Sequence, residues 1–195
     1  AFADEHPEAA VVGPRLVNTD GTLQRSVRGE PTLWRLATEY LFIRKLAPRS
    51  RRLNALYAGG FDHDEVLDVD WLFGPALLVR REAADAVGLF DEDFFMFSEE
   101  VDWMTRFRRA GWKVLFFPGA QVVHVGGASH GGNLYIENLR GHLRWFEKHR
   151  GPKEAERVRK LLLWSLRLRA LVLRREQYRD GVRFLSSGTA RTLLK

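Results

Sequence analysis

The chain has 195 residues, of which 45% are apolar and 29% charged, which suits one globular domain with a hydrophobic core. It has no cysteine, which excludes disulfides and thiolate metal sites and fits a reducing compartment. It also has no apolar run of about 18 residues, which excludes a membrane-spanning helix. The net charge of +6 is unevenly distributed along the chain. Residues 151–195 hold 12 Lys and Arg against 4 Asp and Glu, a net charge of +8. Residues 1–150 hold the other 19 Lys and Arg against 21 Asp and Glu, a net charge of −2.

In the first half of the chain, short apolar segments alternate with turn residues, and apolar residues at helical spacing mark a longer helix. The elements predicted there, in chain order, are a helix end at residues 2–6, a strand at 11–14, a turn at 18–21, a helix at 32–46 and a glycine-rich stretch at 57–64. The largely apolar residues 69–79 predict one buried strand with an irregularity at Gly74-Pro75.

In the second half, the predicted elements are a helix at residues 81–87, a helix capped by Ser98, strands at 113–118 and 121–125, a loop at 126–132, and helices at 135–150 and 154–179. Strands mixed with helices indicate the α/β class, but three or four strands are too few for a complete doubly wound sheet. The simplest explanation is a partner layer encoded before Ala1.

Three carboxylates fall in the first turn of the helix capped by Ser98, where acids suit the helix dipole. Glu100 lies three and four positions before Trp103 and Met104, which places it on the apolar face, whereas Glu99 and Asp102 lie on the polar face and are expected to be solvated. A carboxylate in an apolar position is costly unless it has a use, so Glu100 is the first candidate for chemistry, as a general base. The alternative, equally supported by the pattern, is an acid that reaches solvent or pairs with an arginine of its own helix.

His124 ends an apolar strand directly before the glycine-rich loop at residues 126–132. Sites form at such strand ends in α/β proteins, and with His130 nearby and acids upstream a divalent metal site is one interpretation. Imidazole with carboxylate or phosphate oxygens suits Mn²⁺ or Mg²⁺ better than Zn²⁺, because the chain has no thiols. The loop backbone could approach phosphate, although it lacks the spacing of a P-loop. These two patterns more commonly correspond to a core histidine whose hydrogen bonds are satisfied and to a loop that only connects two elements.

Asp68 and Asp70 flank Val69 and fall on one face of the expected strand. Two carboxylates placed in this way could bind a metal ion or sugar hydroxyls. A solvated entry to the strand explains them equally well.

The helix predicted at residues 153–179 carries a cationic stripe beside an apolar stripe. Basic residues together with Trp and Leu are typical of an interfacial membrane helix, and a helix docked on the domain is the alternative. A nucleic-acid contact ranks lowest, because the chain has no nucleic-acid-binding motif and residues 1–150 are slightly acidic. The cationic stripe comprises Lys153, Lys160, Arg167 and Arg174, and the apolar stripe Leu161, Trp164, Leu168 and Leu171.

Four segments resemble, in their order and spacing, the family-2 inverting glycosyltransferases, especially bacterial rhamnosyltransferase-like members. They are residues 11–33, 69–103, 108–129 and 139–152, and the middle two are the most specific. The resemblance implies a GT-A fold, a nucleotide-sugar donor and a divalent cation, Mn²⁺ or Mg²⁺. It also implies inversion in one step, in which a carboxylate deprotonates the acceptor hydroxyl, which then displaces a nucleoside diphosphate.

The resemblance also assigns roles to individual residues. The acidic pair of the family matches Glu99-Glu100, with Glu in place of Asp at the second position, so the role of base falls to Glu100. Pro75 departs from the usual Ala in the segment that lines the cleft. The candidates are Glu100, Glu99 and Asp102 as catalytic residues, Trp71, Gly74, Pro75, Ala76, Arg25 and Arg28 as substrate-binding residues, and His124 as a metal or phosphate contact.

We therefore expect residues 1–150 to form the acceptor-side part of a GT-A domain, with a mixed sheet flanked by helices, and residues 151–195 to form a basic amphipathic helical tail. The nucleotide-binding half of the family, with its Asp-x-Asp metal motif, is expected before Ala1. The chain alone is accordingly expected to be inactive and to bind nucleotide sugars poorly.

The expected function is transfer of a sugar from a nucleotide-diphosphate donor to a saccharide or lipid-linked acceptor, in cell-surface polysaccharide synthesis. We expect a cytoplasmic protein, peripheral on the inner face of the plasma membrane through residues 153–179, with no nucleic-acid partner. The alternative is a membrane-associated binding or regulatory fragment without catalytic activity of its own. No pattern in the sequence indicates an oligomeric state.

Overall fold

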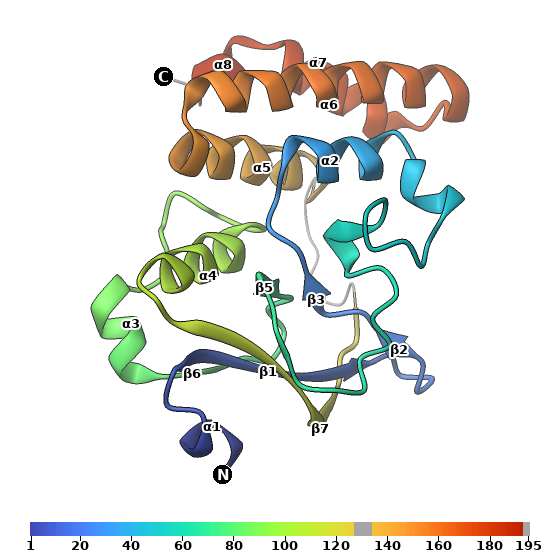
Figure 1. Cartoon of the computed structure of the whole chain (residues 1–195). Coiled ribbons are helices and arrows are strands. Elements are labelled where there is room, and N and C mark those ends of the chain that lie inside the picture. The colour runs from blue at the N-terminus through green and yellow to red at the C-terminus, as the bar shows by residue number, and fades with distance from the viewer. Residues whose placement is uncertain (127–133, 193–195) are drawn as a thin grey trace.

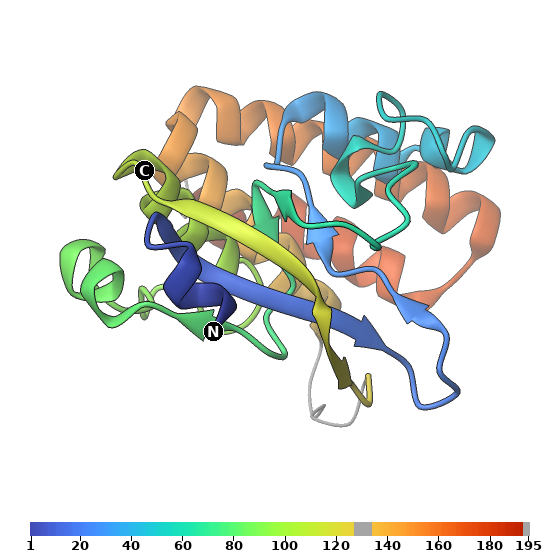
Figure 2. The same cartoon turned by 60° about the horizontal axis from the view of Figure 1, so that its bottom comes forward.

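A long pair of parallel strands forms the centre of a curled mixed sheet that helices flank, in a computed structural model that describes residues 1–126 and 134–192 (Figure 1). The two strands are β1 (Ala9–Val17) and β7 (Lys113–Val123), which run side by side in both views (Figure 2). Both are rich in apolar and β-branched residues, which suit a buried, pleated surface. The sequence-based expectation of a mixed α/β architecture is confirmed.

The other strands are short and extend this central pair. β2 (Leu23–Gln24) and β6 (Leu78–Val79) pair antiparallel with the two ends of β1, and β4 (Leu67–Asp68) pairs antiparallel with β7. A separate two-stranded sheet joins β3 (Val27–Arg28) to β5 (Trp71–Leu72). The first sheet therefore has the order β2-β1-β7-β4, with β6 also on β1.

Helices lie in layers on the sheet. In Figure 1, α4 lies directly over the sheet, α2, α5 and α6 form an upper layer, and α1 lies beneath the sheet. The helices, in chain order, are α1 (Phe2–Glu5), α2 (Leu33–Tyr40), the 3₁₀ helices η1 (Ile43–Leu46) and η2 (Ala55–Tyr57), α3 (Arg81–Val87), α4 (Glu99–Arg109), α5 (Leu134–Arg150), α6 (Pro152–Leu173), α7 (Glu176–Ser186) and α8 (Gly188–Thr192).

Helix α4 separates two hydrophobic clusters. Its Met104 and Phe107, both 0% exposed, pack on the sheet and on α3, and each such buried side chain stabilises the fold by roughly 1.5–3 kcal/mol. Its Val101 belongs to the upper cluster, which α2, α5, α6 and α7 complete. Leu143 of α5 and Leu162 of α6 share that upper cluster, so the predicted division between residues 150 and 151 falls inside one core. No helix of the described part of the chain is long and apolar enough to cross a membrane.

The single strand predicted at residues 69–79 is wrong. Leu72 pairs with Val27 in the small sheet, and Val79 pairs with Val11 in the main sheet. Gly74 and Pro75 lie in the turn between the two strands. Proline has no N–H to continue a ladder, so an apolar run containing it supplies two short strands instead of one.

Other boundaries also differ from the prediction. The strands predicted at 113–118 and 121–125 form the one strand β7, whose register against β1 shifts after Phe117. The basic amphipathic helix predicted for the tail is three helices, because α6 ends at Leu173 and Arg174 takes a left-handed conformation, with φ of 50°. The short helix α3 has the predicted bounds.

Candidate functional site

A cavity of about 340 Å³ lies where the N-terminal end of α4 meets the small sheet and the upper helices. This volume is within the range of small-molecule sites. Its walls combine aromatic rings with a small number of charged and amide groups. The lining residues are Arg28, Pro31, Glu39, Tyr40, Leu56, Tyr57, Trp71, Phe73, Phe97, Ser98, Glu100, Val101, Tyr135, Asn138, His142 and Arg169.

Glu100 is the acid of α4 that lines this cavity. Its side chain is 7% exposed, and its Oε2 atom has no hydrogen-bond partner among the described residues. Burial, helped by the neighbouring Glu99, raises the pKa of Glu100 to about 7, although Arg28 and backbone amides act in the opposite sense. The prediction that Glu100 lies in an apolar position is confirmed. A carboxyl group with this pKa beside a cavity is suited to accept a proton near neutral pH.

The chain enters α4 through two consecutive left-handed residues, Phe97 with φ of 67° and Ser98 with φ of 69°. Ser98 is at the predicted cap position, but its side chain makes no capping hydrogen bond. The corner packs against Gly141 in the middle of α5, where an added Cβ would lie 2.7 Å from the Phe97 carbonyl oxygen. Gly141 therefore permits the close approach that places Glu100 at the cavity. Backbone strain of this kind persists only where the surrounding structure holds it.

Arg28 and two aromatic residues form the wall beside the small sheet. The Arg28 Nη1 donates to the carbonyl oxygens of Arg25 and Val27, and its guanidinium lies 4.5 Å from the centre of the Tyr57 ring. The Trp71 indole N–H donates to Gly29 O at 2.9 Å, which fixes the ring at the cavity edge. Arg28 and Trp71, both predicted to bind substrate, are thus brought together with Glu100.

The upper wall consists of residues that the sequence analysis did not identify. Tyr40 of α2 donates from its hydroxyl to Asn138 of α5 at 3.2 Å. Arg169 of α6, 8% exposed, donates to the carbonyl oxygens of Tyr40 and Glu39 at the end of α2. Burial lowers the pKa of His142 to about 4, so this cavity residue is an uncharged imidazole at neutral pH.

One of these residues did leave a signal in the sequence. Arg169 follows Val158, Leu162 and Leu166 at helical spacing, which places a charged residue on the buried face of α6. The tyrosines and Asn138 belong to no motif; they come from α2, η2 and α5, and only the tertiary fold brings them to one cavity.

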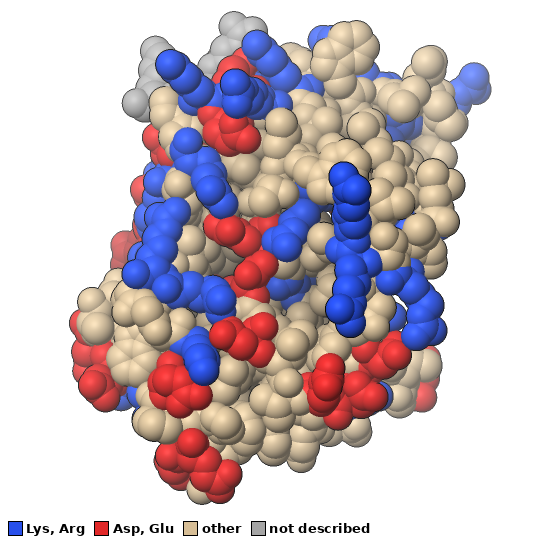
Figure 3. Space-filling view, in the orientation of Figure 1, with Lys and Arg blue, Asp and Glu red and all other residues tan. Residues whose placement is uncertain are grey.

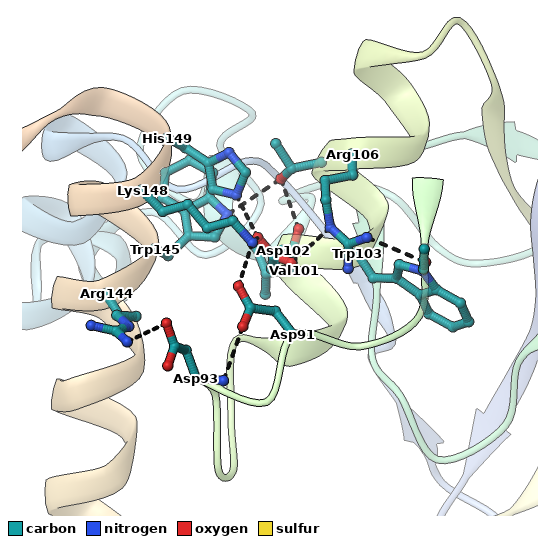
Figure 4. A network of polar contacts seen from close by, with 12 residues as sticks. Asp91, Asp93, Val101, Asp102, Trp103, Arg106, Arg144, Trp145, Lys148 and His149 are labelled. Carbon is teal, nitrogen blue, oxygen red and sulfur yellow. Dashed lines mark hydrogen bonds and ion pairs between the residues drawn. The ribbon is translucent and has the colours of Figure 1, made fainter. Parts of the chain in front are cut away.

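Asp102 lies in a buried polar network and not at the cavity (Figure 4). Its side chain is 0% exposed, which contradicts the predicted solvation; Glu99, predicted to be solvated as well, is partly buried. The Asp102 Oδ1 accepts from Lys148 and His149, each at 2.7 Å, and Oδ2 accepts from Arg106 Nε at 2.9 Å. Burial alone would raise the pKa of Asp102, but these hydrogen bonds hold it at about 2.

The same network fixes the protonation of its histidine. Arg109 Nη1 donates to His149 Nδ1 at 2.8 Å, so Nδ1 is an acceptor and Nε2 carries the proton donated to Asp102. Lys148 also contacts Asp91 at 2.6 Å. These bonds join the helix that carries Glu100 to the end of α5, which holds both elements in register.

His124 lies at the end of β7, separated from the cavity by one ring. Its imidazole is 5.6 Å from the Phe73 ring, which lines the cavity. Gln24 Nε2 donates to Asn18 Oδ1 at 3.0 Å, so Gln24 Oε1 accepts from His124 Nδ1 at 2.7 Å. The proton of His124 is therefore on Nδ1, and Nε2 carries a lone pair. Histidines that bind metal are commonly held in this way through the other ring nitrogen.

Among the described residues, His124 is the predicted donor for a divalent cation. They contain no group of three or more His, Asp or Glu side chains that could hold a metal ion. Asp68 is paired with Arg108, and Asp70 is paired with Arg35 at 3.0 Å and accepts from the Glu30 backbone N–H. This pair is thus engaged with arginines. His130 and the loop at residues 127–132 lie outside the described residues.

The remaining candidate residues lie in two places. Gly74 is beside Glu100, because a Cβ on Gly74 would be 3.9 Å from Glu100 Oε1. Pro75 is exposed, and neither it nor Ala76 lines the described cavity. Arg25 donates to Phe61 O at 3.2 Å and contributes its own carbonyl oxygen to hold Arg28.

Charge is distributed unevenly over the molecule. In Figure 3, acidic side chains gather toward the lower edge of this face and at its centre, whereas basic side chains lie over the upper helices and at mid-height on both sides. This arrangement agrees with the excess of Lys and Arg after residue 150. A positive helical layer favours anionic partners.

Comparisons with known proteins give one kind of relative. The chain is 32% identical, over 185 residues, to the N-acetylglucosaminyl-diphospho-decaprenol L-rhamnosyltransferases of Mycobacterium tuberculosis strains CDC 1551 / Oshkosh and ATCC 25618 / H37Rv. The aligned region covers 93% of this chain, and the chain spans 59% of the length of these relatives. No protein-family model matches the chain, and no solved structure matches it. The similarity confirms the predicted resemblance to rhamnosyltransferase-like glycosyltransferases.

Proposed function

Because the chain resembles rhamnosyltransferase-like glycosyltransferases, we propose that it contributes the acceptor site and the general base of a family-2 glycosyltransferase with a GT-A fold. The observation that carries the proposal is the position of Glu100, a buried carboxyl group with a pKa of about 7 at the edge of a 340 Å³ cavity. A base poised near the working pH is what deprotonation of a hydroxyl requires.

The proposed reaction takes place in one step. An acceptor hydroxyl lies in the cavity and gives its proton to the Glu100 carboxylate. The hydroxyl oxygen attacks the anomeric carbon of a nucleotide sugar from the side opposite the leaving group. The new glycosidic bond forms as the bond to the diphosphate breaks, and the nucleoside diphosphate leaves with that electron pair. Attack from the opposite side inverts the anomeric configuration.

The neighbouring residues act on this carboxylate and on the acceptor. Glu99 raises the proton affinity of Glu100, and Arg28 limits that rise. Gly74 leaves space over the carboxylate, and Trp71 with Tyr57 offers aromatic surface to a sugar ring. The Asp102 network positions α4 and takes no proton from the substrate. Pro75, Ala76 and Arg25 shape the backbone around these residues.

A divalent cation, Mn²⁺ or Mg²⁺, would stabilise the charge that develops on the leaving diphosphate. His124 fits the role of one ligand or of a diphosphate contact, because its Nε2 carries the free lone pair. The further ligands would come from residues other than those described.

The relatives support the choice of substrates, because their name specifies an N-acetylglucosaminyl-diphospho-decaprenol acceptor and a rhamnosyl group. We propose a nucleotide-sugar donor and a lipid-linked saccharide acceptor, used in cell-surface polysaccharide synthesis on the cytoplasmic side of the membrane. The aromatic and amide groups of the cavity suit the saccharide part of such an acceptor, because they combine apolar faces with hydrogen-bonding groups.

The test is Glu100→Gln in the complete natural polypeptide that contains this chain. Turnover should fall by about 10²–10⁴-fold, because an amide cannot accept the proton, while calorimetric binding of the nucleotide sugar stays within about twofold. Glu92→Gln is the control, since Glu92 is an exposed acid in the preceding loop. If the Glu100→Gln enzyme keeps near-normal turnover, Glu100 is not the base.

A further inference from the structure

The outward face of α6 exposes large apolar side chains that no other described element covers. The exposed fractions are 71% for Trp164, 55% for Leu168, 75% for Leu171 and 66% for Val172. The spacing of residues 164, 168 and 171 places the first three on one face of the helix, which we call the outer face. The opposite face holds the buried part of the core. Exposed apolar residues grouped in this way mark an interaction surface, unlike apolar residues that occur singly.

Cationic side chains surround the outer face. Exposed basic residues precede the apolar residues on the helix, lie between them and follow them. The acidic residues of α6 are paired within the helix, Glu154 with Arg157 and Glu156 with Arg159 and Lys160. The basic residues concerned are Lys153, Arg157, Lys160, Arg167, Arg174 and Arg175.

We infer that the outer face of α6 binds the surface of an anionic lipid bilayer. Trp and Leu enter the boundary between head groups and acyl chains, and the long stems of Lys and Arg let their charges remain among lipid phosphates. Each basic residue near such a surface adds attraction that salt weakens. An acidic protein would satisfy the cations, but it would leave Trp164 and Leu171 without an apolar partner.

The position of the cavity agrees with this orientation. Arg169 lines the cavity from the inner side of α6, within one turn of Leu168 and Leu171 on the outer face. An α-helix with its side chains is about 10–12 Å across, so the outer face and the cavity are separated by one helix. A lipid-linked acceptor would then have its saccharide near the cavity and its lipid in the bilayer. This last step rests on the proposed function, whereas binding to the bilayer does not.

The experiment is co-sedimentation of the protein with vesicles that contain about one-third phosphatidylglycerol, compared with neutral phosphatidylcholine vesicles. The wild type should bind the anionic vesicles and lose affinity as salt increases. The triple variant Trp164→Ser, Leu168→Ser and Leu171→Ser should lose at least about tenfold in partition coefficient. Its far-ultraviolet circular dichroism and its midpoint of urea unfolding should be unchanged, because these side chains are exposed.

The matched control replaces three leucines that are exposed elsewhere, Leu46, Leu78 and Leu89, with serine, and should bind vesicles like the wild type. Tryptophan fluorescence gives a second readout, since a blue shift on binding should disappear in Trp164→Phe while binding itself is retained. Equal binding by the two triple variants would overturn the inference. The inference would also be overturned if the triple variant of the outer face lost self-association but bound vesicles like the wild type.

Failure here is distinguishable from failure of the proposed function. Glu100→Gln should bind vesicles like the wild type and still lose turnover, because Glu100 lies in the cavity and not on the outer face. Vesicle binding requires neither donor nor acceptor.

Discussion

Gly141 lies so close to Ser98 that a Cβ on Gly141 would be 2.8 Å from the Ser98 Oγ and 2.7 Å from the carbonyl oxygen of Phe97. A glycine in the middle of a helix costs about 0.5–1 kcal/mol relative to alanine. Its presence in α5 is explained by the left-handed corner that it accommodates. The corner in turn fixes where α4 begins, one residue before Glu100.

We expect Gly141→Ala to displace this corner, because the added Cβ would meet the backbone carbonyl oxygen of Phe97 as well as the side chain of Ser98. The free energy of unfolding should fall by about 1–3 kcal/mol, measured by urea denaturation, and turnover of the complete enzyme should fall with it. Gly188→Ala is the control, since a Cβ there meets nothing within 4 Å and its φ is not left-handed. An unchanged Gly141→Ala protein would show that the corner can move without cost.

Gly74→Ala should leave stability nearly unchanged, because the added Cβ would be at ordinary contact distances of 3.8–3.9 Å from Glu100. Gly74→Leu should keep the fold and reduce turnover, since a larger side chain occupies the space over the carboxylate. Steady-state kinetics should show a higher KM for the acceptor and an unchanged KM for the donor. Equal acceptor kinetics in the wild type and Gly74→Leu would contradict this position for the acceptor.

Activity should rise with pH to a plateau above about 7, because the base must be deprotonated and the pKa of Glu100 is about 7. Glu99→Gln should move the midpoint of the kcat/KM profile to lower pH, since the Glu99 carboxylate raises the pKa of Glu100. A midpoint that stays in place would mean that burial alone sets the pKa.

Stability should show the opposite trend in the same pH range. The pKa of Glu100 is higher in the folded chain than its ordinary value of 4.5, so the folded state holds this proton more tightly. That contribution is complete below about pH 4.5 and is lost as pH rises through about 7, a difference of roughly 3 kcal/mol. Glu100→Gln should therefore gain stability relative to the wild type between pH 5 and pH 8.5 in urea titrations (about 3 kcal/mol). The Glu92→Gln control should show no such gain.

Asp102→Asn should be strongly destabilising, by about 3 kcal/mol, because it leaves Lys148 and Arg106 beside a buried neutral group. The pKa of Asp102 is depressed to about 2, so its stabilisation is present above about pH 3.8 and is lost as pH falls through about 2. Asp93→Asn is the matched control, since Asp93 is 62% exposed where it pairs with Arg144. It should change stability by less than about 0.5 kcal/mol.

Gln24→Leu should release the proton of His124 from its fixed position, because the acceptor at Nδ1 is removed. Nitrogen-15 chemical shifts of the imidazole should change from one tautomer to a mixture of the two. Asn18→Ala should have a smaller effect, since Asn18 accepts from the amide nitrogen of Gln24 and leaves in place the oxygen that accepts from His124. A fixed tautomer in Gln24→Leu would show that another group holds the ring.

The sequence predicted helices better than strands for physical reasons that individual residues illustrate. The bounds of α3 follow from local periodicity and from Gly88 at its end. The segment at residues 69–79 was misassigned because its apolar residues pair with two different sheets, and partner choice is not encoded locally. The break at Arg174 was missed because a left-handed arginine has no sequence signature.

The residues of the candidate site also fall into those that local spacing predicts and those that only the tertiary fold brings together. The burial of Glu100 was predictable because residues three and four positions along its helix are apolar. The burial of Asp102 was not, because its partners His149 and Lys148 come from a helix more than 40 residues away. The upper wall of the cavity depends on α2, α5 and α6 meeting, so only Arg169, a charge on a buried face, could have been suspected.

The cavity draws its walls from segments as far apart as Arg28 and Arg169, and this has a consequence for the growing polypeptide. Glu100 leaves the ribosome well before α6, which closes the cavity above it. Until that helix docks, we expect the carboxyl group to be more solvated and its pKa to lie nearer the ordinary value of 4.5. The proton affinity of this one side chain therefore reports whether the last helices are in place. An infrared or NMR titration of Glu100 would separate mature from immature chains without any substrate.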